Sequence, residues 1–397
     1  MSKMNTTCNQ QCDICHKIFD KKQPYNRHLK RKTPCKINKI NIIEKSKFEL
    51  LNNSNYINNN INNINNINNN IDFIKNFDKL LILNMSHIKP VLKWAGGKGQ
   101  ILDKLFYKFP TEIKNYYEPF IGGGSVFLEF LKQLEEDKIK ISGKIILNDF
   151  NTDLINLYNT IKNNHDKLLC QLNDLKSNYN KSPLIHQVPR YKFIYTVNDT
   201  IDNVIPKGKS YVYYYYRKEY NEIDISKGDN SIRKSALLLF LNKTCFRGLY
   251  RTGKNGFNVP YGNTPNASIY SVGQINTLNT LFNKYDIIFH NTDFKESLKD
   301  IELGDFVYMD PPYHPMDTGK SFVSYNSDDF KNGHKELVVL CKDLKEKNIK
   351  FLHSNSFCKF NTEHYRDNGF KTETISCRRR INSKKPQDTD LEYLIYN

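Results

Sequence analysis

The chain has 397 residues and a formal net charge of +17, with 59 Lys and Arg against 42 Asp and Glu. This excess favours a polyanionic partner, either a nucleic acid or an anionic membrane surface. No stretch approaches the roughly 18 apolar residues of a membrane span, and residues 1–11 lack the apolar core of a signal peptide. The 9 cysteines show no secreted disulfide framework. We therefore expect an intracellular protein without a membrane partner, and a monomer.

Residues 1–40 form a basic unit with several cysteines and a histidine. Residues 1–50 hold 12 Lys and Arg against 4 Asp and Glu, so the charge excess is concentrated here. Two cysteines separated by two residues are followed by a histidine after a 12-residue spacer and by a cysteine after six more residues. This spacing is close to that of a zinc finger. We predict that four side chains bind zinc: Cys12, Cys15, His28 and Cys35.

The zinc-finger pattern is imperfect. Its last ligand is Cys35 rather than a histidine, and it follows six residues after His28 instead of the usual three to five. An unmetallated basic tail is the alternative, and Cys8 is an alternative ligand. The basic run at residues 30–32 favours phosphate contacts, although such runs are often only solvated faces. We expect this unit to tether the protein to a nucleic acid or to another protein.

The following segment, at about residues 41–85, is rich in asparagine. Residues 52–70 contain 13 Asn in 19 positions, interleaved with isoleucine. Such a composition cannot bury a core, so we predict a disordered linker that carries no chemistry.

From residue 86 onward, short apolar runs alternate with helical patterns, which is typical of an α/β fold. The apolar runs predict five strands: 115–120, 144–149, 286–290, 305–310 and 349–354. Strands that alternate with helices predict a mostly parallel, doubly wound sheet, whose ligands bind beyond the carboxyl ends of the strands. Residues 155–270 suit this sheet less well and predict an insertion that carries substrate recognition.

A glycine-rich turn and an acid follow the first two predicted strands. Gly122 opens a run of three glycines between a strand and a helix, where the backbone can approach a ligand and the helix offers free N–H groups. A purely structural turn is an equal alternative. Asp149 ends the next strand and is placed to accept hydrogen bonds from ribose hydroxyls. Its alternative role is the N-cap of a helix that starts near Asp153.

Upstream, residues 93–98 (KWAGGK) contain the only tryptophan of the chain. The indole of Trp94 could stack on a cofactor, and Lys98 could neutralise a cofactor carboxylate. A place in the core is the commoner role of a single tryptophan, and it stays the alternative.

The most specific pattern is Asp310-Pro-Pro-Tyr313, at the end of an apolar strand. An exocyclic amine of a nucleobase is a poor nucleophile because its lone pair is delocalised. Two acceptors, the Asp310 carboxylate and the Pro311 carbonyl, would draw its hydrogens and free that lone pair. Consecutive prolines fix the backbone without a competing N–H, and Tyr313 offers a face for an extruded base. The pattern predicts methyl transfer from a sulfonium to an exocyclic amine, with a proline-rich turn as the alternative.

Five segments together resemble the Dam-type (D12 class) family of DNA adenine-N6 methyltransferases, in the family's order and across about residues 88–397. They are 93–98 (KWAGGK), 118–128 (EPFIGGGSVFL), 148–154 (NDFNTDL), 242–262 (NKTCFRGLYRTGKNGFNVPYG) and 310–313 (DPPY). The resemblance implies a Rossmann-like, doubly wound S-adenosylmethionine-dependent methyltransferase domain over 86–397. It also implies a mainly helical target-recognition domain inserted at about 155–270, and double-stranded DNA as the substrate.

The matching motifs imply roles for single residues. The implied cofactor contacts are Trp94, Lys98, Gly122, Asp149 and Asp310. Asp310 would also face an adenine flipped out of the duplex, together with Pro311 and Tyr313. Asp293 is a further candidate for contact with the adenine of the cofactor.

The segment at residues 246–251 resembles the DNA-reading hairpin of the family. By that match Arg251 would read a guanine, as arginine does bidentately in the major groove, and Phe246 would lie near the flipped base. Position 247 is Arg where relatives often carry a small polar residue. The family's expected target is a GATC-like site.

Two other functions remain open. An amino methyltransferase that acts on cytosine N4 or on RNA would use the same DPPY chemistry, but the KWAGGK and NVPYG segments argue against it. A zinc-finger nucleic-acid-binding protein with an inactive enzyme domain is the second alternative. The intact Trp94, Lys98, Asp149 and DPPY argue against that.

Overall fold

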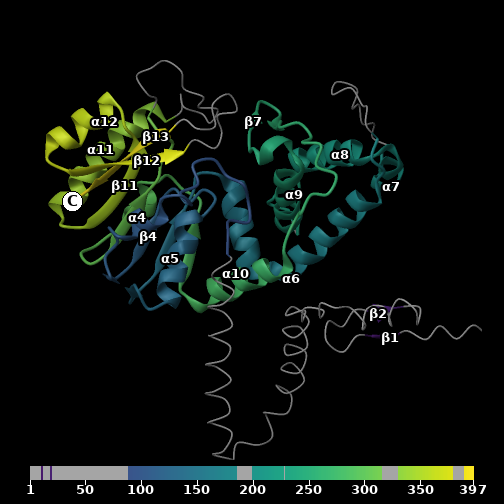
Figure 1. The fold of residues 1–397 in the computed structure, drawn as a ribbon, viewed down its shortest axis with the longest axis horizontal. Helices are drawn as coiled ribbons and strands as arrows, with labels where there is room; N and C mark the ends of the chain where they lie inside the picture. Colours follow the sequence, from purple (N-terminus) through teal and green to yellow (C-terminus); the bar gives the residue numbers. More distant parts are fainter. Residues whose placement is uncertain are drawn as a thin grey trace, which may run out of the picture. The chain divides into compact units, whose positions relative to one another are not determined.

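The computed structural model describes residues 88–185, 199–227, 229–314, 330–378 and 389–397, together with two short N-terminal strands. The chain divides into two compact units, Met1–Asp78 and Lys79–Asn397. In the first unit, β1 (Gln10–Gln11) pairs antiparallel with β2 (Ile18–Phe19). The predicted zinc ligands and the predicted linker lie outside the described residues. The second unit, drawn in Figure 1, has a mixed α/β fold built on a seven-stranded sheet.

The sheet has the strand order β12-β13-β11-β10-β4-β6-β9, and its five neighbours from β11 to β9 are parallel. These five are β11 (Lys350–Ser356), β10 (Phe306–Met309), β4 (Tyr116–Glu118), β6 (Ile145–Asn148) and β9 (Ile287–His290). Each coincides with one of the strands predicted from an apolar run. The predicted strands and the mostly parallel sheet are therefore confirmed.

Two strands at one edge of the sheet were not predicted. β13 (Thr389–Tyr396) pairs antiparallel with β11, and β12 (Lys371–Arg378) pairs antiparallel with β13. Among the described side chains of β12, only Ile375 is buried. An edge strand of this kind presents no apolar run, so the sequence pattern gave no signal for it.

Both faces of the sheet are buried, because the side chains of a strand alternate between two hydrophobic clusters. On β10, Phe306 and Tyr308 enter one cluster, whereas Val307 and Met309 enter the other. A parallel strand that is buried on both faces requires an almost continuous apolar sequence. This requirement explains the apolar runs of β11, β10, β4 and β6, whose side chains enter both clusters, whereas β9 at the edge of the sheet is buried only at Ile287.

Nine α-helices surround the sheet or stand beside it in the described part of the chain. They are α4 (Leu102–Phe106), α5 (Ser125–Glu135), α6 (Thr152–Lys181), α7 (Ile201–Val204), α8 (Lys209–Glu222), α9 (Asn230–Thr244), α10 (Val272–Lys284), α11 (Lys331–Glu346) and α12 (Lys359–His364). None of these helices is long and apolar enough to cross a membrane.

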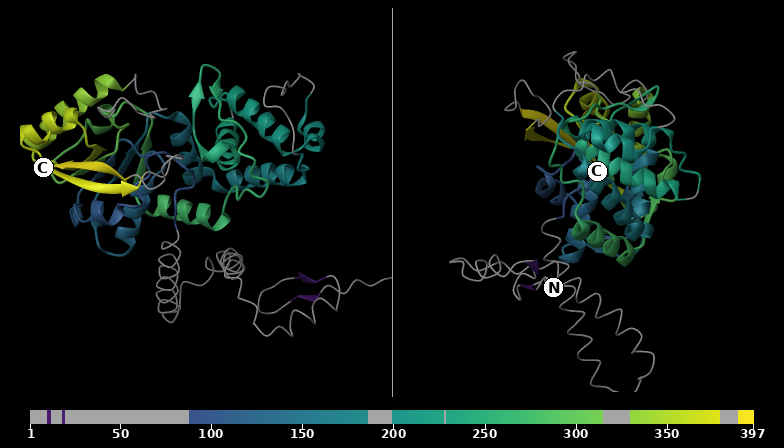
Figure 2. Two further views of the ribbon diagram at one scale, coloured as in Figure 1. Left: turned by 45° about the horizontal axis from the view of Figure 1, so that its top comes forward. Right: turned by 90° about the vertical axis from the view of Figure 1, so that its right-hand side faces the viewer.

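A group of helices lies beside the sheet rather than on its faces. α7, α8 and α9 gather on one side of it, together with the part of α6 that follows a kink at Asn164 (Figures 1 and 2). Tyr179 near the end of α6 stacks edge-on against Phe240 of α9, with 5.4 Å between the ring centroids. The same region of α6 reaches α8, because Asn178 Nδ2 donates to the Tyr216 hydroxyl at 2.9 Å. Side-chain packing thus joins these helices into one body.

The strand order reverses between β4 and β10. From β4 the chain continues through β6 to β9 at one edge, and it then returns to place β10 on the other side of β4. The loops after the two central strands run in opposite directions at such a switch point, and ligands of α/β sheets bind there. The glycine turn follows β4, and the DPPY tetrapeptide follows β10. The topology therefore brings the two strongest sequence motifs to the same edge of the sheet.

Asn148 joins the ends of three neighbouring strands at this edge. Its Nδ2 donates to the carbonyl oxygens of Pro119 and Thr292, each at 3.1 Å, and its Oδ1 accepts from the Thr292 N–H at 3.0 Å. Pro119 follows β4, and Thr292 follows β9. Asn148 is 1% exposed, so water cannot replace these bonds.

We expect Asn148→Ala to lower the free energy of unfolding by about 2 kcal/mol, because it leaves buried backbone groups unpaired. Urea denaturation measures the change. The exposed Asn266→Ala serves as a control and should change the stability by less than about 0.5 kcal/mol. Equal stability of Asn148→Ala and the wild type would contradict this role.

Candidate active site

The turn after β4 depends on its glycines. Gly122 and Gly124 have φ values of +50° and +74°, which residues with a Cβ rarely adopt. Tyr158 of α6 fixes the turn, since its hydroxyl donates to the Gly122 carbonyl at 2.9 Å. A Cβ on Gly124 would lie only 2.8 Å from that hydroxyl oxygen. Because α5 begins directly afterwards at Ser125, its first N–H groups lie at the turn.

Trp94 lies against this turn. A Cβ on Gly123 would stand 2.8 Å from Trp94 Cβ, and a Cβ on Gly122 would stand 3.2 Å from Trp94 Cδ1. The segment that carries Trp94 is also tied to α5, because the Lys98 N–H donates to Ser125 Oγ at 3.0 Å. Trp94 is half-buried and contacts the edge of the core. It therefore packs between the glycine turn and the edge of the core.

Asp149 follows β6 and lies beside the same turn. Its Oδ2 accepts from the Gly122 N–H at 2.9 Å, and its Oδ1 accepts from the Asn151 N–H at 2.8 Å. The N-cap of α6 is Asn151, whose side chain accepts from the Leu154 N–H at 3.2 Å. The interpretation of Asp149 as the N-cap is therefore wrong. Burial raises the pKa of the Asp149 carboxyl, while the two backbone hydrogen bonds lower it.

A buried ion pair joins the KWAGGK segment to the DPPY tetrapeptide. Lys98 Nζ lies 2.6 Å from Asp310 Oδ2, and it also donates to the Gly96 carbonyl at 2.8 Å. The Lys98 side chain is 2% exposed and that of Asp310 is 19% exposed. Burial alone would lower the pKa of Lys98, but two nearby carboxylates raise it above the usual value. Lys98 therefore stays an ammonium, and Asp310 keeps one edge accessible.

The second carboxylate belongs to Glu392 of β13, a residue that sequence reasoning missed. Glu392 Oε1 lies 3.5 Å from Lys98 Nζ and accepts from the Tyr313 hydroxyl at 2.6 Å. Lys98 Nζ also stands 4.9 Å from the centroid of the Tyr313 ring. The available signal was a single acid between apolar residues, in Leu391-Glu-Tyr-Leu-Ile.

The electrostatics keep Asp310 ionised at neutral pH. Burial has the largest effect and raises the pKa of Asp310, Lys98 lowers it, and Glu392 raises it. The resulting pKa is about 6. A carboxyl with this pKa is mostly a carboxylate at pH 7, the form that accepts hydrogen bonds. Nearby, the buried Glu118 accepts from the Tyr116 hydroxyl at 2.7 Å, and burial raises its pKa well above the usual value.

The loop after β10 is tied to the end of β11. Pro311 is buried directly after Asp310, whereas Pro312 is exposed. Beyond Tyr313, the His314 N–H donates to Asn355 Oδ1 at 3.0 Å, and Ser356 Oγ donates to the His314 carbonyl at 2.7 Å. The backbone that carries the tetrapeptide is therefore held at both ends.

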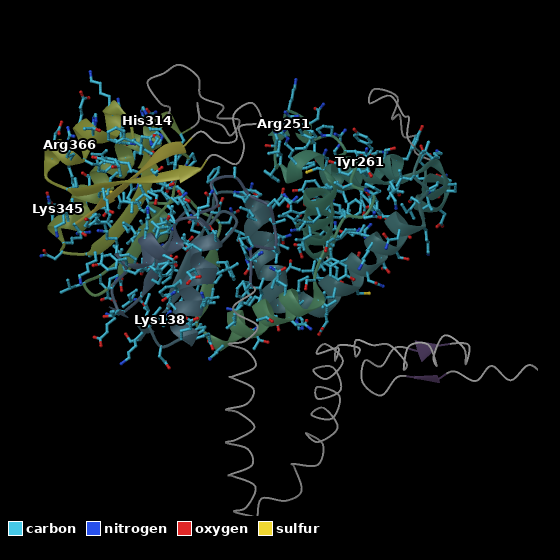
Figure 3. All side chains as sticks on the ribbon, in the orientation of Figure 1. Lys138, Arg251, Tyr261, His314, Lys345 and Arg366 are labelled. Carbon is cyan, nitrogen blue, oxygen red and sulfur yellow. The ribbon has the colours of Figure 1, made fainter. Side chains whose placement is uncertain are left out.

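The predicted DNA-reading residues lie on an exposed segment. Phe246 is 42% exposed, and Arg251 is exposed at the start of a hairpin formed by β7 (Thr252–Gly253) and β8 (Gly256–Phe257). Arg251 Nε donates to Asn258 Oδ1 at 2.6 Å. In Figure 3, Arg251 and His314 lie on the same side of the unit, opposite Lys138. Arg251 and the end of the DPPY loop therefore share one side of the molecule.

Asn242 connects this exposed segment to the KWAGGK segment. Its Oδ1 accepts from the Lys93 N–H at 2.8 Å, and its Nδ2 donates to the carbonyls of Lys93 and Gly248 at 2.9 and 3.1 Å. Tyr250 makes a second connection, with its ring centroid 4.9 Å from that of Trp94. The Tyr250 hydroxyl donates to Asp153 Oδ2 at 3.1 Å. Sequence reasoning found the segment but missed these contacts.

The remaining predicted residues are not part of this cluster. Asp293 is exposed after β9, and its Oδ1 accepts from the Lys295 N–H at 2.9 Å. The predicted zinc ligands lie outside the described ranges. Within those ranges, no three His, Cys, Asp or Glu side chains gather as metal ligands.

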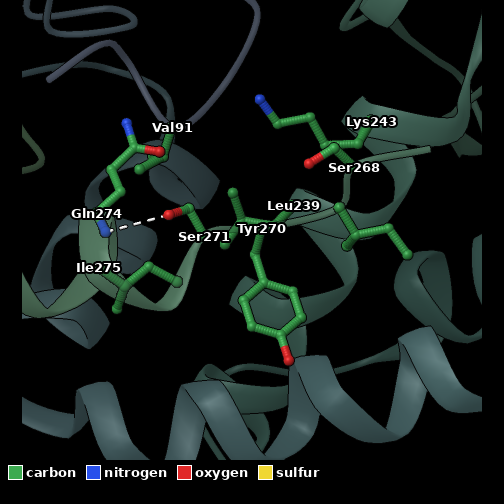
Figure 4. A pocket seen from close by; sticks show the side chains of 9 residues that line it. Val91, Leu239, Lys243, Ser268, Tyr270, Ser271, Gln274 and Ile275 are labelled. Atoms are coloured by element: carbon green, nitrogen blue, oxygen red, sulfur yellow. Dashed lines mark hydrogen bonds between the residues drawn. The ribbon is translucent and has the colours of Figure 1, made fainter. Parts of the chain in front are cut away.

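A small pocket of about 100 Å³ lies between the end of α9 and the start of α10 (Figure 4). It is lined by Val91, Leu239, Lys243, Ser268, Ile269, Tyr270, Ser271, Gln274 and Ile275. None of the described site residues predicted from the sequence lines it. The pocket therefore lies apart from the chemistry of the candidate site.

Comparison with known proteins shows the family. Residues 94–381 match the model of the D12 class N6 adenine-specific DNA methyltransferases. The chain belongs to this family. It is 33% identical to the Type II methyltransferase M.MjaIII of Methanocaldococcus jannaschii over 321 residues, which cover 78% of the chain and 99% of the relative.

Two further relatives are similar to this DNA adenine-N6 methyltransferase over about three quarters of its length. It is 30% identical to the Type II methyltransferase M1.LlaDCHI of Lactococcus lactis, over 77% of the chain and 93% of the relative. It is 28% identical to the DNA adenine methylase of Escherichia coli K12, over 75% of the chain and 91% of the relative.

Family membership implies S-adenosylmethionine as the methyl donor, and the candidate site has a chemistry that fits it. At Gly123 the turn has no space for a Cβ, because Trp94 Cβ would lie only 2.8 Å from it. Asp149 offers acceptors for ribose hydroxyls. Asp310 and Glu392 around the single ammonium of Lys98 leave an excess of negative charge for a sulfonium.

We expect Gly123→Ala to weaken S-adenosylmethionine binding by about tenfold or more, because the new Cβ displaces Trp94. Isothermal titration calorimetry measures the dissociation constant. Gly99→Ala is the matched control, since a Cβ at that position meets nothing within 4 Å. The same affinity in Gly123→Ala and in the control would show that Trp94 does not shape the cofactor site.

Proposed function

We propose that this methyltransferase moves a methyl group from S-adenosylmethionine to N6 of an adenine that is flipped out of double-stranded DNA. The observation that carries the proposal is the 2.6 Å contact between Lys98 and Asp310. It joins the DPPY tetrapeptide to the segment that carries Trp94 and lies against the glycine turn. A methyl donor bound at the glycine turn and an adenine held at the tetrapeptide would therefore lie next to each other.

Each residue of the site has a proposed part in binding. Asp149 accepts hydrogen bonds from the ribose of the cofactor, and Trp94 and Gly122 line its place at the turn. When bound, S-adenosylmethionine supplies an electrophilic methyl group. Lys98 holds one oxygen of Asp310 and so orients the carboxylate.

Asp310 and Pro311 then act on the adenine. The free edge of the Asp310 carboxylate and the Pro311 carbonyl accept the two hydrogens of the N6 amine, which returns its lone pair to the nitrogen. Tyr313 stacks on the extruded base. The amine loses one proton as it gains the methyl group, and the Asp310 carboxylate would accept that proton.

The finer architecture belongs to the same proposal. We infer a Rossmann-like, doubly wound cofactor domain with a target-recognition domain inserted at about 155–270. The helices beside the sheet and the exposed hairpin after residue 251 support it. Arg251 would read a guanine, and Phe246 would lie near the flipped base.

A single assay tests the activity. Purified protein is incubated with duplex DNA and methyl-labelled S-adenosylmethionine, and the DNA is digested to nucleosides. We expect the label in N6-methyladenine. Label in N4-methylcytosine would contradict the proposed substrate, and the absence of transfer would favour an inactive enzyme domain.

Asp310→Ala should abolish transfer, lowering the rate by about a thousandfold or more, while the affinity for DNA persists. Gel-shift titration measures that affinity separately. Asp166→Ala, which changes an exposed acid on α6, is the control and should keep the wild-type rate. Wild-type turnover in Asp310→Ala would refute the assigned role.

The N-terminal unit is proposed as a zinc-binding tether, with Cys12, Cys15, His28 and Cys35 as ligands. The antiparallel pairing of β1 and β2 supports it, because Cys12 and Cys15 lie between these strands in the sequence. A zinc ion held there would organise the unit rather than take part in the methyl transfer.

We expect one zinc ion per wild-type chain and none in Cys12→Ser, measured by atomic emission. Cys170→Ser is the matched control, because Cys170 is an exposed cysteine of α6 outside the predicted set. It should retain the metal. A wild-type protein without zinc would reject the site.

A further inference from the structure

One buried ammonium faces two carboxylates in this site, and the motifs account for only one of them. Lys98 Nζ is 2.6 Å from Asp310 Oδ2 and 3.5 Å from Glu392 Oε1. The Glu392 side chain is 10% exposed. A buried carboxylate is costly unless charged or hydrogen-bonding groups compensate it, so its presence calls for a physical reason.

The fold brings Glu392 to the site through the antiparallel strand β13. In the register of the sheet, Glu392 stands opposite Ser356 at the carboxyl end of β11. Because β13 runs antiparallel to β11, its first residues lie at the edge where the parallel strands end. That edge also carries Asp310, directly after β10. A residue near the C-terminus of the chain is thereby placed beside the DPPY tetrapeptide.

Glu392 also holds the aromatic residue of the tetrapeptide. The Tyr313 hydroxyl donates to Glu392 Oε1 at 2.6 Å, the same oxygen that faces Lys98. This hydrogen bond restricts the rotation of the Tyr313 side chain about its Cα–Cβ bond. The Lys98 ammonium, 4.9 Å from the ring centroid, contacts the same ring. One carboxylate thus links the stacking face for the base to the cation that orients Asp310.

We propose that Glu392 is a positioning residue for the methyl transfer, which fixes Tyr313 through its hydroxyl and shares the Lys98 ammonium with Asp310. The inference rests on the proposed function, since it assigns a further residue to the same site. Glu392 acts through Tyr313 and Lys98 and not on the adenine itself.

If Glu392 acts through its charge, it should also change the pKa of Asp310, which a packing role alone would not do. The groups that act on Asp310 are Lys98, Glu392, Tyr313, Tyr308 and Glu118. Burial and then Glu392 raise the pKa of Asp310, while Lys98 lowers it, with a result of about 6. Removal of the charge of Glu392 should therefore lower the pKa of Asp310. Activity requires the carboxylate, so the acidic limb of the pH–rate profile should move to lower pH.

The test compares kcat/KM for S-adenosylmethionine between pH 5 and 8 in the wild type, Glu392→Gln and Glu392→Asp. We expect an acidic limb near pH 6 in the wild type. Glu392→Gln should move the limb down by about half a pH unit or more and lower kcat about tenfold. Glu392→Asp keeps the charge but reaches less far, so its limb should stay in place while kcat falls.

Glu373→Gln is the matched control, because Glu373 lies on the neighbouring β12 and pairs with Lys108 at 2.7 Å, away from the site. It should leave both the rate and the limb unchanged. A Glu392→Gln variant with the wild-type rate, or with a lower rate at every pH and no shift of the limb, would overturn the proposal.

The activity of the wild type distinguishes a failure of the proposed function from a failure of the role assigned to Glu392. If the wild type forms no N6-methyladenine, the proposed function fails, and the role of Glu392 fails with it. If the wild type is active and Glu392→Gln is unchanged, only the role of Glu392 fails. Should Glu392→Gln not fold, as judged by circular dichroism, a Glu392→Asp variant with wild-type kcat would still contradict the positioning role.

Discussion

The buried contact between the Lys98 ammonium and the Asp310 carboxylate joins two motifs that are 212 residues apart in the sequence. The strand order makes this contact possible, because the order reverses between the parallel neighbours β4 and β10, and the turns that follow both strands lie at the same edge of the sheet. Burial strengthens the attraction, and it also sets the cost of separating the pair. The contact fixes the DPPY tetrapeptide relative to the segment that carries Trp94, which is itself tied to the helix after the glycine turn.

Side-chain contacts also connect the segment that leads into the exposed hairpin to the KWAGGK segment. The Asn242 side chain makes hydrogen bonds to the backbone of Lys93 and of Gly248. Tyr250 contacts Trp94 through its ring and Asp153 through its hydroxyl. A residue that contacts DNA and a residue that contacts the cofactor would thus belong to one packed unit. The enzyme needs such a unit because transfer requires a base and a methyl donor to be held in register.

Much of this arrangement could be predicted from the sequence, and the remainder has a physical reason. Four of the five parallel strands, β11, β10, β4 and β6, are buried on both faces, so their apolar runs were visible, and Asp149 and Asp310 follow two of them. β12 gave no such signal because it is an edge strand, which needs no continuous apolar run, and the apolar run of β13 is interrupted by Glu392. Glu392 was missed because its place beside Asp310 depends on the antiparallel register of β13 with β11, which no local sequence pattern specifies. The N-cap interpretation of Asp149 was wrong because the N-cap of α6 is Asn151, whose side chain accepts from the Leu154 N–H.

The most direct test of the account is a crystal structure with S-adenosylhomocysteine and a duplex that contains the target adenine. We expect the N6 nitrogen to lie about 3 Å from both an Asp310 carboxylate oxygen and the Pro311 carbonyl, with the sulfur on the opposite side of the nitrogen. Asp310 turned away from the base, or a cofactor bound away from the turn at Gly122, would contradict it.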